Sequence, residues 1–332
     1  MNDFTRLLNE YFTDYLVNKK GVSNNTIKTY RDCFIQLIEY LDKIKKIKPN
    51  KITISVFSFD LINEFLDYLE TDGGVSTSTR NNRLAAIKSF FKYVGYKLPE
   101  YLNITSSIRE ISKKKYCQKE INYLTIDATK HLLNSFNLKD KKEFRCFSII
   151  LLLYESGARV SELINIKKRD IRFDKPYTLI LFGKGNKYRR IPIDSVVVDA
   201  IKKYISLFNV TDDEYLFFNS RREKLTREGV NSILNKYFIR AKIKNSSLYP
   251  SDISAHCLRH SKAMHLLENG VNLIYIRDLL GHTSVTTTEI YSKANPEIKR
   301  KHIEEVTKQQ NINLNYTTDE ENELISWLKH SI

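Results

Sequence analysis

The chain has 332 residues, of which 42% are hydrophobic, and this is enough for two domains with cores of ordinary size. Its 54 Lys and Arg residues outnumber its 39 Asp and Glu residues, and the resulting net charge of +15 favours a polyanionic partner such as nucleic acid. No apolar run approaches the ~20 residues that span a membrane, and the four cysteines include no CxxC pair, so we expect no membrane segment, free thiols and a reducing, cytoplasmic location.

Residues 1–105 are expected to form a helical domain. The segment "SNNTIKTYRDCFIQLIEYL" starts with a serine typical of an N-cap, Ser23, and continues with apolar residues at helical spacing. "SFDLINEFLDYLE" is a second amphipathic segment, and "STSTRNNRLAAIKSFFKYVG" is a third, predicted to end at a capping glycine, Gly95. The third segment has a basic side whose residues are candidates for DNA binding, although each could equally be a solvated surface charge: Arg80, Arg83 and Lys88.

Residues 106–122 interrupt the helical pattern. The stretch "SSIREISKKKYCQKEINY" is polar, basic and aperiodic, which is typical of an interdomain linker. A lysine-rich linker can lie along a phosphate backbone or can serve only solubility.

Residues 123–332 are expected to form a second domain that is mostly α with a small β element. Helical patterns resume after a candidate cap, Thr125, and a dense apolar helix is predicted to stop at Gly157, with a new helix near Val160. "PYTLILFGKGNKYRRIPI" then predicts two short strands around a tight turn. The rest is helical, ending in an amphipathic tail helix at about 316–330.

One helix of this domain carries several basic groups close together. In "AHCLRHSKAMHLLENG", His256, Arg259 and His260 share one helical face. A guanidinium and an imidazole placed side by side repel one another when both are charged, so the pattern predicts an anion between them. Three other positions have the same character: Arg159 at a break between helices, Lys184 at the hairpin tip and His282 at a helix end.

Together with Tyr291, these residue types suit metal-free phosphoryl transfer. Arginines neutralise and orient phosphate oxygens, and a tyrosine oxygen can form a covalent intermediate that conserves the energy of the phosphodiester. A lysine can give a proton to the leaving 5′-oxygen, and histidines can bind the phosphate or take the tyrosine proton. The sequence has no carboxylate pair spaced like a two-metal nuclease site, so we expect no metal or other cofactor.

The order and spacing of these segments resemble the tyrosine recombinase (phage integrase) family, in particular its short Xer-type and transposon-encoded members. "ESGARVSELINI" resembles the first arginine box of the family, and "HCLRHSKAMHLLENGVNLIYIRDLLGHTSVTTTEIYSKA" resembles the second. "GKGNKYRRIPI" resembles the catalytic β-hairpin, and the N-terminal helices resemble the SAM-like core-binding domain.

The resemblance implies a site-specific DNA recombinase that cuts and rejoins strands through a 3′-phosphotyrosine. It implies six catalytic residues, namely Arg159, Lys184, His256, Arg259, His282 and Tyr291. It also implies that Glu162 orients a catalytic cation. The runner-up activities are a type IB topoisomerase-like nicking and closing enzyme and a catalytically inactive DNA-binding relative.

Three further expectations concern single residues, and a fourth concerns a metal site. Tyr275 is a second candidate nucleophile, but it lies in an apolar-periodic helix and is expected in the core. Lys187 competes with Lys184 as the general acid and is otherwise expected to contact a phosphate. His260 is expected to pack or cap beneath the site, and a zinc site formed by His256, His260 and Cys257 is disfavoured because the glutamate of an HExxH motif is absent.

The expected partner is double-stranded DNA with two inverted arms around a short crossover region. Because the core-binding helices begin close to Met1, we expect no additional arm-binding domain. The resemblance implies a tetramer on DNA in which the tail helix packs in trans on a neighbouring protomer, while docking on its own domain is the alternative. Integration or excision of a mobile element and resolution of chromosome or plasmid dimers are both compatible with the sequence.

Overall fold

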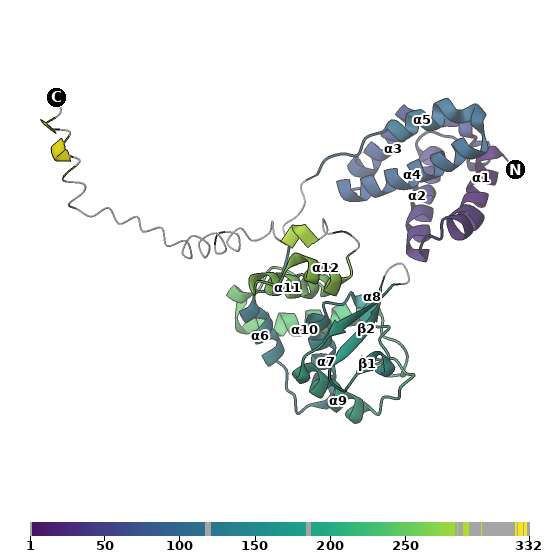
Figure 1. Ribbon diagram of the computed structural model, residues 1–332. Coiled ribbons are helices and arrows are strands. Elements are labelled where there is room, and N and C mark those ends of the chain that lie inside the picture. Colours follow the sequence, from purple (N-terminus) through teal and green to yellow (C-terminus); the bar gives the residue numbers. More distant parts are fainter. Residues whose placement is uncertain are drawn as a thin grey trace. The chain divides into compact units, whose positions relative to one another are not determined.

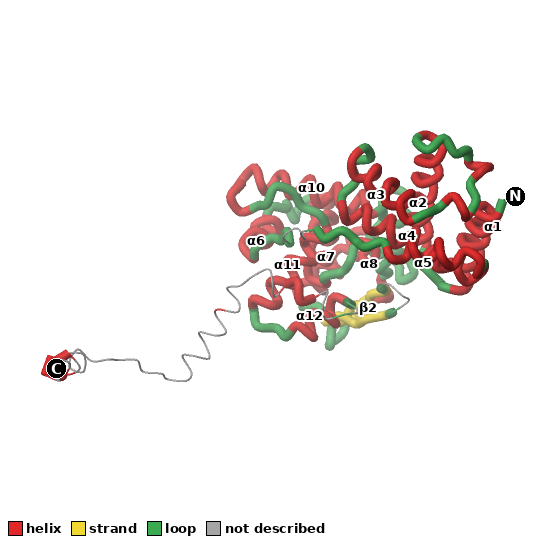
Figure 2. Tube along the Cα trace, turned by 90° about the horizontal axis from the view of Figure 1, so that it is seen from above, coloured by secondary structure: helices red, strands yellow, loops and turns green. Residues whose placement is uncertain are grey.

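The computed structural model describes residues 2–116, 121–183, 187–282, 284, 288–291 and 300, together with residues 323, 325–327, 329 and 330 of the tail. The chain divides into two compact units, Met1–Lys119 and Glu120–Ile332 (Figure 1). Helices dominate both units, and the described strands belong to one small sheet in the second (Figure 2). Among the helices of the described residues, none has the length and apolarity needed to span a membrane.

In the N-terminal unit, serine side chains cap the first turns of the longest helices. Its elements are α1 (Asp3–Glu10), a π-helix (Tyr11–Lys19), α2 (Asn24–Lys43), α3 (Phe59–Thr71), α4 (Thr77–Lys97) and α5 (Leu102–Glu110), with 3-10 turns at Pro49–Lys51, Ile54–Val56 and Pro99–Tyr101. Ser23, Ser58 and Ser76 each accept a hydrogen bond from a backbone amide three residues on. The N-cap predicted at Ser23 is therefore confirmed.

Aromatic side chains fill the centre of this unit. The ring of Phe90 meets those of Phe4, Tyr11, Phe34 and Phe91 edge-on, at centroid distances of 5.1–5.8 Å. Edge-to-face contacts of this kind add to the free energy gained by burying the rings. Because α1, α2 and α4 contribute to one aromatic cluster, the unit has a core of its own.

Two expectations about the end of this unit are wrong. Helix α4 does not end at Gly95 but continues to Lys97. Gly95 instead lies where α5 approaches α4, and a Cβ there would come within 2.9 Å of the Thr105 hydroxyl. Helix α5 also extends to Glu110, into the segment expected as a linker, because Ile108 and Ile111 are buried in the core.

The second unit combines helices with a three-stranded antiparallel sheet. The order of its elements is α6 (Ile126–Asn134), α7 (Lys141–Ser156), α8 (Val160–Leu163), a 3-10 turn (Lys168–Asp170), β1 (Ile171–Arg172), β2 (Thr178–Phe182), β3 (Tyr188–Pro192), α9 (Ser195–Phe208), α10 (Arg227–Lys244), a 3-10 turn (Ser246–Leu248), α11 (Ala255–Glu268) and α12 (Leu273–Leu280). The strands pair in the order β1-β2-β3, with Phe182 opposite Tyr188. The mainly α fold with a small β-sheet is as the sequence predicts.

Helix α7 forms the centre of this unit. It runs from its Asp140 cap through a buried apolar stretch to Gly157, whose backbone takes the left-handed conformation at φ 56°. It packs against α9 and α11, while α12 contacts both α11 and β3. Arg159 caps the next helix, α8, only two residues after this glycine. These contacts bring the end of α7, the start of α8, one face of α11 and the end of α12 to a common point.

Candidate active site

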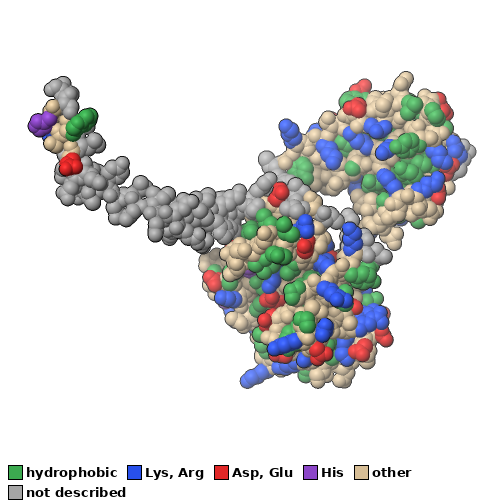
Figure 3. Space-filling model, in the orientation of Figure 1, with side chains coloured by type: hydrophobic (Ala, Val, Ile, Leu, Met, Phe, Trp, Pro, Cys, Tyr) green, Lys and Arg blue, Asp and Glu red, His purple; other side chains and the backbone are tan. Residues whose placement is uncertain are grey.

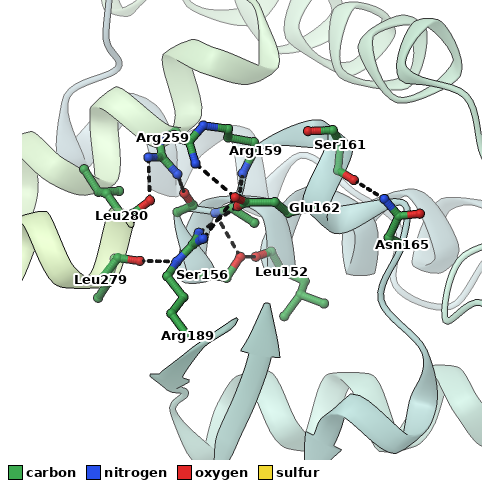
Figure 4. A network of polar contacts seen from close by, with 12 residues as sticks. Leu152, Ser156, Arg159, Ser161, Glu162, Asn165, Arg189, Arg259, Leu279 and Leu280 are labelled. Carbon is green, nitrogen blue, oxygen red and sulfur yellow. Dashed lines mark hydrogen bonds and ion pairs between the residues drawn. The ribbon is translucent and has the colours of Figure 1, made fainter. Parts of the chain in front are cut away.

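Two arginines meet at that point in very different surroundings. The Arg159 side chain is 34% exposed, and its guanidinium donates to Glu162 Oε1 at 3.0 Å. Arg259 on α11 has no exposed surface. Its two terminal nitrogens donate to backbone carbonyls at the ends of two helices, Gly157 O at 2.7 Å and Leu280 O at 2.6 Å (Figure 4). Burial lowers the pKa of the Arg259 guanidinium, and the neighbouring Arg159 lowers it further.

Glu162 binds two arginines, Arg159 and Arg189, through its carboxylate. Its side chain is 3% exposed and binds Arg189 of β3 through two hydrogen bonds, of 2.9 and 2.7 Å. It also accepts the backbone amide of Arg159 at 2.9 Å. Burial alone would raise the pKa of Glu162, but the hydrogen bonds from Arg189 and the Arg159 amide outweigh it and leave this pKa below its ordinary value. The Glu162 carboxylate is therefore ionised where it contacts Arg159 and Arg189.

Arg189 was missed in the sequence. Besides its pair with Glu162, its Nε donates to Leu279 O at 2.8 Å, so this one side chain joins β3 to α8 and α12 (Figure 4). Alternation along β3 was the available signal, because Arg189 shares a strand face with the buried Ile191, whereas Arg190 points to solvent. An arginine on the buried face of a strand requires a partner inside the protein.

The histidines of α11 lie beside the tyrosine. His260 Nδ1 is 2.9 Å from the hydroxyl of Tyr291, which is 1% exposed. His256 is exposed one turn earlier, and its ring meets that of His260 at a centroid distance of 4.3 Å. His260 thus contacts the expected nucleophile itself, which differs from the packing or capping role predicted for it.

His282 stands on the other side of Tyr291. Its ring is nearly parallel to the tyrosine ring, with centroids 6.5 Å apart, and its Nδ1 is 3.0 Å from the hydroxyl of the buried Thr288. Gly281 precedes it with φ 65°, and a Cβ at that glycine would come within 2.9 Å of the Arg189 guanidinium. Thr288 was another residue that sequence reasoning missed, and the short threonine run was its only signal.

Charge and burial act together on the titrating groups. Partial burial, then Arg259 and Arg159, lower the pKa of His256, and the same causes lower that of His282 to about 4. Burial raises the pKa of the Tyr291 phenol, against the opposing effect of the two arginines. The site thus keeps its histidines neutral and its tyrosine protonated while it holds an excess of positive charge.

The remaining predicted residues fall in three places. Lys184 lies outside the described residues. Lys187 is exposed where the chain enters β3, and its carbonyl accepts the Gly183 amide at 2.9 Å. Tyr275 is 70% exposed, so the expectation that it belongs to the core is wrong. Helix α12 buries Ile276 and Leu280, one turn apart, and this leaves Tyr275 on its outer face.

In the N-terminal unit, the structure corrects one of the expected DNA contacts. Arg80 is 3% exposed, and its guanidinium lies within reach of the Ser112 carbonyl at 3.4 Å, so it faces the interior of its own unit. Arg83 is half-buried and donates to Thr29 O at 2.8 Å. Lys88 is also half-buried, and burial lowers its pKa. Other Lys and Arg side chains are spread over the visible face of each unit (Figure 3).

Within the described ranges, no three His, Cys, Asp or Glu side chains are grouped so as to hold a metal ion, so the zinc alternative has no ligand set there. The site instead combines a buried tyrosine hydroxyl, two histidines beside it and a cluster of guanidinium groups. This site, on a mainly α unit that follows a separate helical unit, defines a DNA strand-transferring enzyme of the tyrosine recombinase class.

Comparison with known proteins gives the family. Residues 122–297 match the phage integrase family, and residues 9–95 match the phage integrase N-terminal SAM-like domain. The chain belongs to the phage integrase family, and its activity is site-specific DNA recombination. Similar proteins include the putative integrase/recombinase y4rC of Sinorhizobium fredii, 32% identical over 88% of each chain. The tyrosine recombinase XerD of Staphylococcus epidermidis is 32% identical over 88% of this chain and 95% of its own.

Solved structures with a similar fold include two recombination enzymes. The XerH site-specific recombinase, in a pre-cleavage complex with its difH substrate, is 26% identical and has a TM-score of 0.64, over 80% of this chain and 75% of that one. The Tn1549 transposon integrase shares the fold at 17% identity, with a TM-score of 0.68 over 90% of this chain and 98% of that one.

Proposed function

We propose that the protein recombines DNA by cutting each strand with Tyr291 and holding the cut end as a 3′-phosphotyrosine. The observation that carries this proposal is the Tyr291 hydroxyl, buried and 2.9 Å from His260 Nδ1, within a group of side chains that has excess positive charge. A phenol in this position needs only a phosphodiester in line with it in order to react.

The guanidinium groups supply the charge for the transition state. Arg159, Arg189 and Arg259 are compensated by one carboxylate, that of Glu162. A scissile phosphate bound against Arg159 and Arg259 would relieve this imbalance, and charge that develops on its non-bridging oxygens would be stabilised further. His256 and His282, which are close enough to both arginines for their pKa values to be lowered, are proposed to donate to the same oxygens.

The reaction then proceeds in two balanced steps. Tyr291 Oη gives its proton to a base and attacks the phosphorus, the bond to the 5′-oxygen breaks, and that oxygen takes a proton, which we assign to Lys184 on the β2–β3 hairpin. In the second step the 5′-hydroxyl of another strand gives its proton to the neutral Lys184 and attacks the phosphotyrosine, and Tyr291 leaves and regains its proton from the base. Both steps conserve the number of phosphodiester bonds, so neither requires a cofactor.

The test is a nicked suicide substrate, whose short 5′ fragment diffuses away after cleavage and traps the covalent adduct. The wild-type protein should form an adduct on a denaturing gel, in EDTA as well as without it, and Tyr291→Phe should form none while still shifting DNA on a native gel. Tyr275→Phe is the matched control, because that hydroxyl lies on an exposed helix face, and it should behave as wild type. An adduct that persists in Tyr291→Phe would refute the assignment.

The substrate is proposed to be duplex DNA with two inverted arms around a crossover region, bound by a tetramer in the cytoplasm. The tail supports an assembly role, since its described residues are helical and two large apolar side chains are exposed there, Ile325 at 51% and Trp327 at 64%. We propose that this helix packs in trans on a neighbouring protomer. Sequencing of the junctions formed in cells that express the protein would separate mobile-element integration from dimer resolution.

A further inference from the structure

Among the described residues of the catalytic unit, three pairs place a histidine Nδ1 within hydrogen-bond distance of a tyrosine hydroxyl. In two of these pairs, one of the two side chains is also hydrogen-bonded to a backbone carbonyl, which indicates a structural role. His265 Nε2 lies 2.8 Å from Leu124 O, and its Nδ1 is 2.8 Å from the Tyr154 hydroxyl. His131 Nδ1 lies 2.8 Å from the hydroxyl of Tyr249, which donates to Ala128 O at 3.1 Å. The third pair is His260 with Tyr291, and it lies inside the reaction site.

The groups that face His260 keep it neutral. Burial is the main cause that lowers its pKa to about 4, and His256, Arg259 and His282 add repulsion. A neutral imidazole has one nitrogen free to accept a hydrogen bond. We assign the tautomer that carries its proton on Nε2, in which Nδ1 accepts the hydrogen bond and the hydroxyl of Tyr291 donates it.

We propose that His260 is the general base of the cleavage step and takes the proton of Tyr291 Oη directly at Nδ1. This assignment rests on the proposed function of Tyr291 as the nucleophile. As the Oη–P bond forms, the Oη–H bond breaks and its proton moves to Nδ1, while the electron pair of the P–O5′ bond leaves with the 5′-oxygen. In the rejoining step the same proton returns from His260 to Oη.

The geometry meets the requirements of a base. The 2.9 Å separation of Nδ1 and Oη lies within hydrogen-bond reach of the proton that must move. His282 is less suited, because its Nδ1 lies by the Thr288 hydroxyl and its ring is 6.5 Å from that of Tyr291. The ring of His256 packs against that of His260 with centroids 4.3 Å apart, and the described hydrogen bond to the Tyr291 hydroxyl is that of His260.

The charged groups around His260 also make its proton affinity depend on whether DNA is bound. Without DNA, the repulsion from Arg259, His256 and His282 opposes protonation of His260. A phosphate bound to Arg159 and Arg259 adds negative charge beside these groups and raises the proton affinity of the imidazole. His260 therefore becomes an effective base only when a phosphodiester occupies the site, and Tyr291 stays protonated and unreactive until then.

The test separates proton transfer from positioning. His260→Asn keeps an amide near the place of Nδ1, so it can still bind the tyrosine hydroxyl, but it cannot take a proton; His260→Ala can do neither. Both are compared with wild type on a nicked substrate with a 5′-bridging phosphorothiolate. Its sulfur leaves without a proton, so the rate of adduct formation reports the attack alone. Both variants should be slower by about 10²–10⁴-fold, the range for loss of a general base.

The matched control is His131→Asn, which removes the same kind of pair at a distance from the site and should keep the wild-type rate. The pH dependence gives a second readout. With wild type the rate should level off once His260 is unprotonated in the complex, whereas with His260→Asn it should rise in proportion to hydroxide concentration. A His260→Asn variant that reacts as fast as wild type, or that keeps the wild-type pH profile, would overturn the assignment.

Folding and the proposed function are checked separately. Native-gel binding to a one-arm DNA shows whether each variant is folded. If both variants fail to bind, the ¹⁵N shifts of His260 in the wild-type protein decide: an unprotonated Nδ1 at neutral pH supports the assignment, and a protonated Nδ1 refutes it. If the wild-type protein forms no adduct at Tyr291, both the proposed function and the base assignment are refuted. If the wild-type protein forms the adduct and the His260 variants form it at the same rate, only the base assignment is refuted.

Discussion

Arg159 and Arg259 both carry a guanidinium group, but only that of Arg259 is buried and bound to backbone carbonyls of two helix ends. Arg259 has no exposed surface and donates to the carbonyls of Gly157 and Leu280, whereas Arg159 is 34% exposed and binds the Glu162 carboxylate. The two arginines are therefore expected to make similar contributions to the chemistry and different contributions to stability.

Arg159→Ala and Arg259→Ala should each slow adduct formation by about 10²–10³-fold, the range for loss of one oxyanion donor. Only Arg259→Ala should also lower the free energy of unfolding, by about 2–5 kcal/mol, because it leaves two buried carbonyls unpaired and opens a cavity. Suicide-substrate kinetics and urea unfolding of the full chain measure the two effects. If Arg159→Ala and Arg259→Ala lowered the free energy of unfolding equally, the bonds of Arg259 to the two carbonyls would not contribute specially to stability.

The histidines of the site make stability depend on pH. Burial is the first cause that lowers the pKa values of His260 and His282 to about 4, compared with 6.5 for the ordinary side chain. The unfolded chain binds protons at these positions below about 6.5, and the folded chain does so only near 4, so the free energy of unfolding must decrease as the pH falls through this window.

Thermal unfolding of the full chain between pH 7 and 4 should show this loss, and His260→Asn with His282→Asn should make the loss smaller. A short DNA duplex that carries one arm should reduce it further, because a bound phosphate offsets the charge of protonated histidines. A pH dependence that is unchanged in the double variant would assign the acid sensitivity to other groups.

At the scale of elements, Arg189 joins the β-hairpin to the site. Its bonds to Glu162 and to Leu279 O fix β3 against α8 and α12, and the hairpin that β3 closes carries the proposed general acid. The Arg189 and Glu162 side chains are 12% and 3% exposed, so solvent screens this pair little. Removal of one partner leaves a buried charge without full compensation.

Arg189→Met should therefore lower the free energy of unfolding by about 3–5 kcal/mol, and the double change with Glu162→Gln should recover part of it. Adduct formation on an ordinary phosphodiester should fall more than on the 5′-bridging phosphorothiolate, because a displaced hairpin affects proton delivery first. Urea unfolding and the two substrates provide the measurements. Equal rate losses on both substrates would mean that Arg189 does not position the hairpin.

Local signals in the sequence predicted local structure well. Ser23 and Thr125 are N-caps as expected, because a serine or threonine followed by helical periodicity needs no distant contact. Gly95 and Tyr275 were misassigned because their surroundings come from other elements: α5 against Gly95, and the orientation of α12 for Tyr275. Helical spacing placed His256 and Arg259 together, but the partner of His260 lies 31 residues away and only the fold brings it there.

At the scale of the whole molecule, the tail is the segment whose proposed role in assembly can be tested by truncation. Truncation after residue 315 should leave binding of one protomer to one arm unchanged, and it should remove cooperative binding of a second protomer and impair recombination. The reason is that the exposed apolar residues Ile325 and Trp327 would be absent, and with them the proposed contact between neighbouring protomers.

Gel-shift titrations on two-arm and one-arm sites measure this directly. Trp327→Ala in the full chain is the finer variant, with Lys329→Ala as its control on the same exposed tail. Unchanged cooperativity in the truncated protein would mean that the tail packs only on its own catalytic unit.

The carbonyls that Arg259 binds belong to two chain reversals, at Gly157 and beside Gly281, both in the left-handed conformation. The same cation thus serves the architecture in addition to its proposed part in the reaction, whereas Tyr291 Oη can be lost as a single atom. A lineage that abandoned cleavage but kept DNA binding would have no selection against loss of that hydroxyl, yet it would still be constrained at Arg259. In genome surveys, an intact second arginine would accordingly say little about whether a descendant still recombines DNA, and the tyrosine would be the informative position.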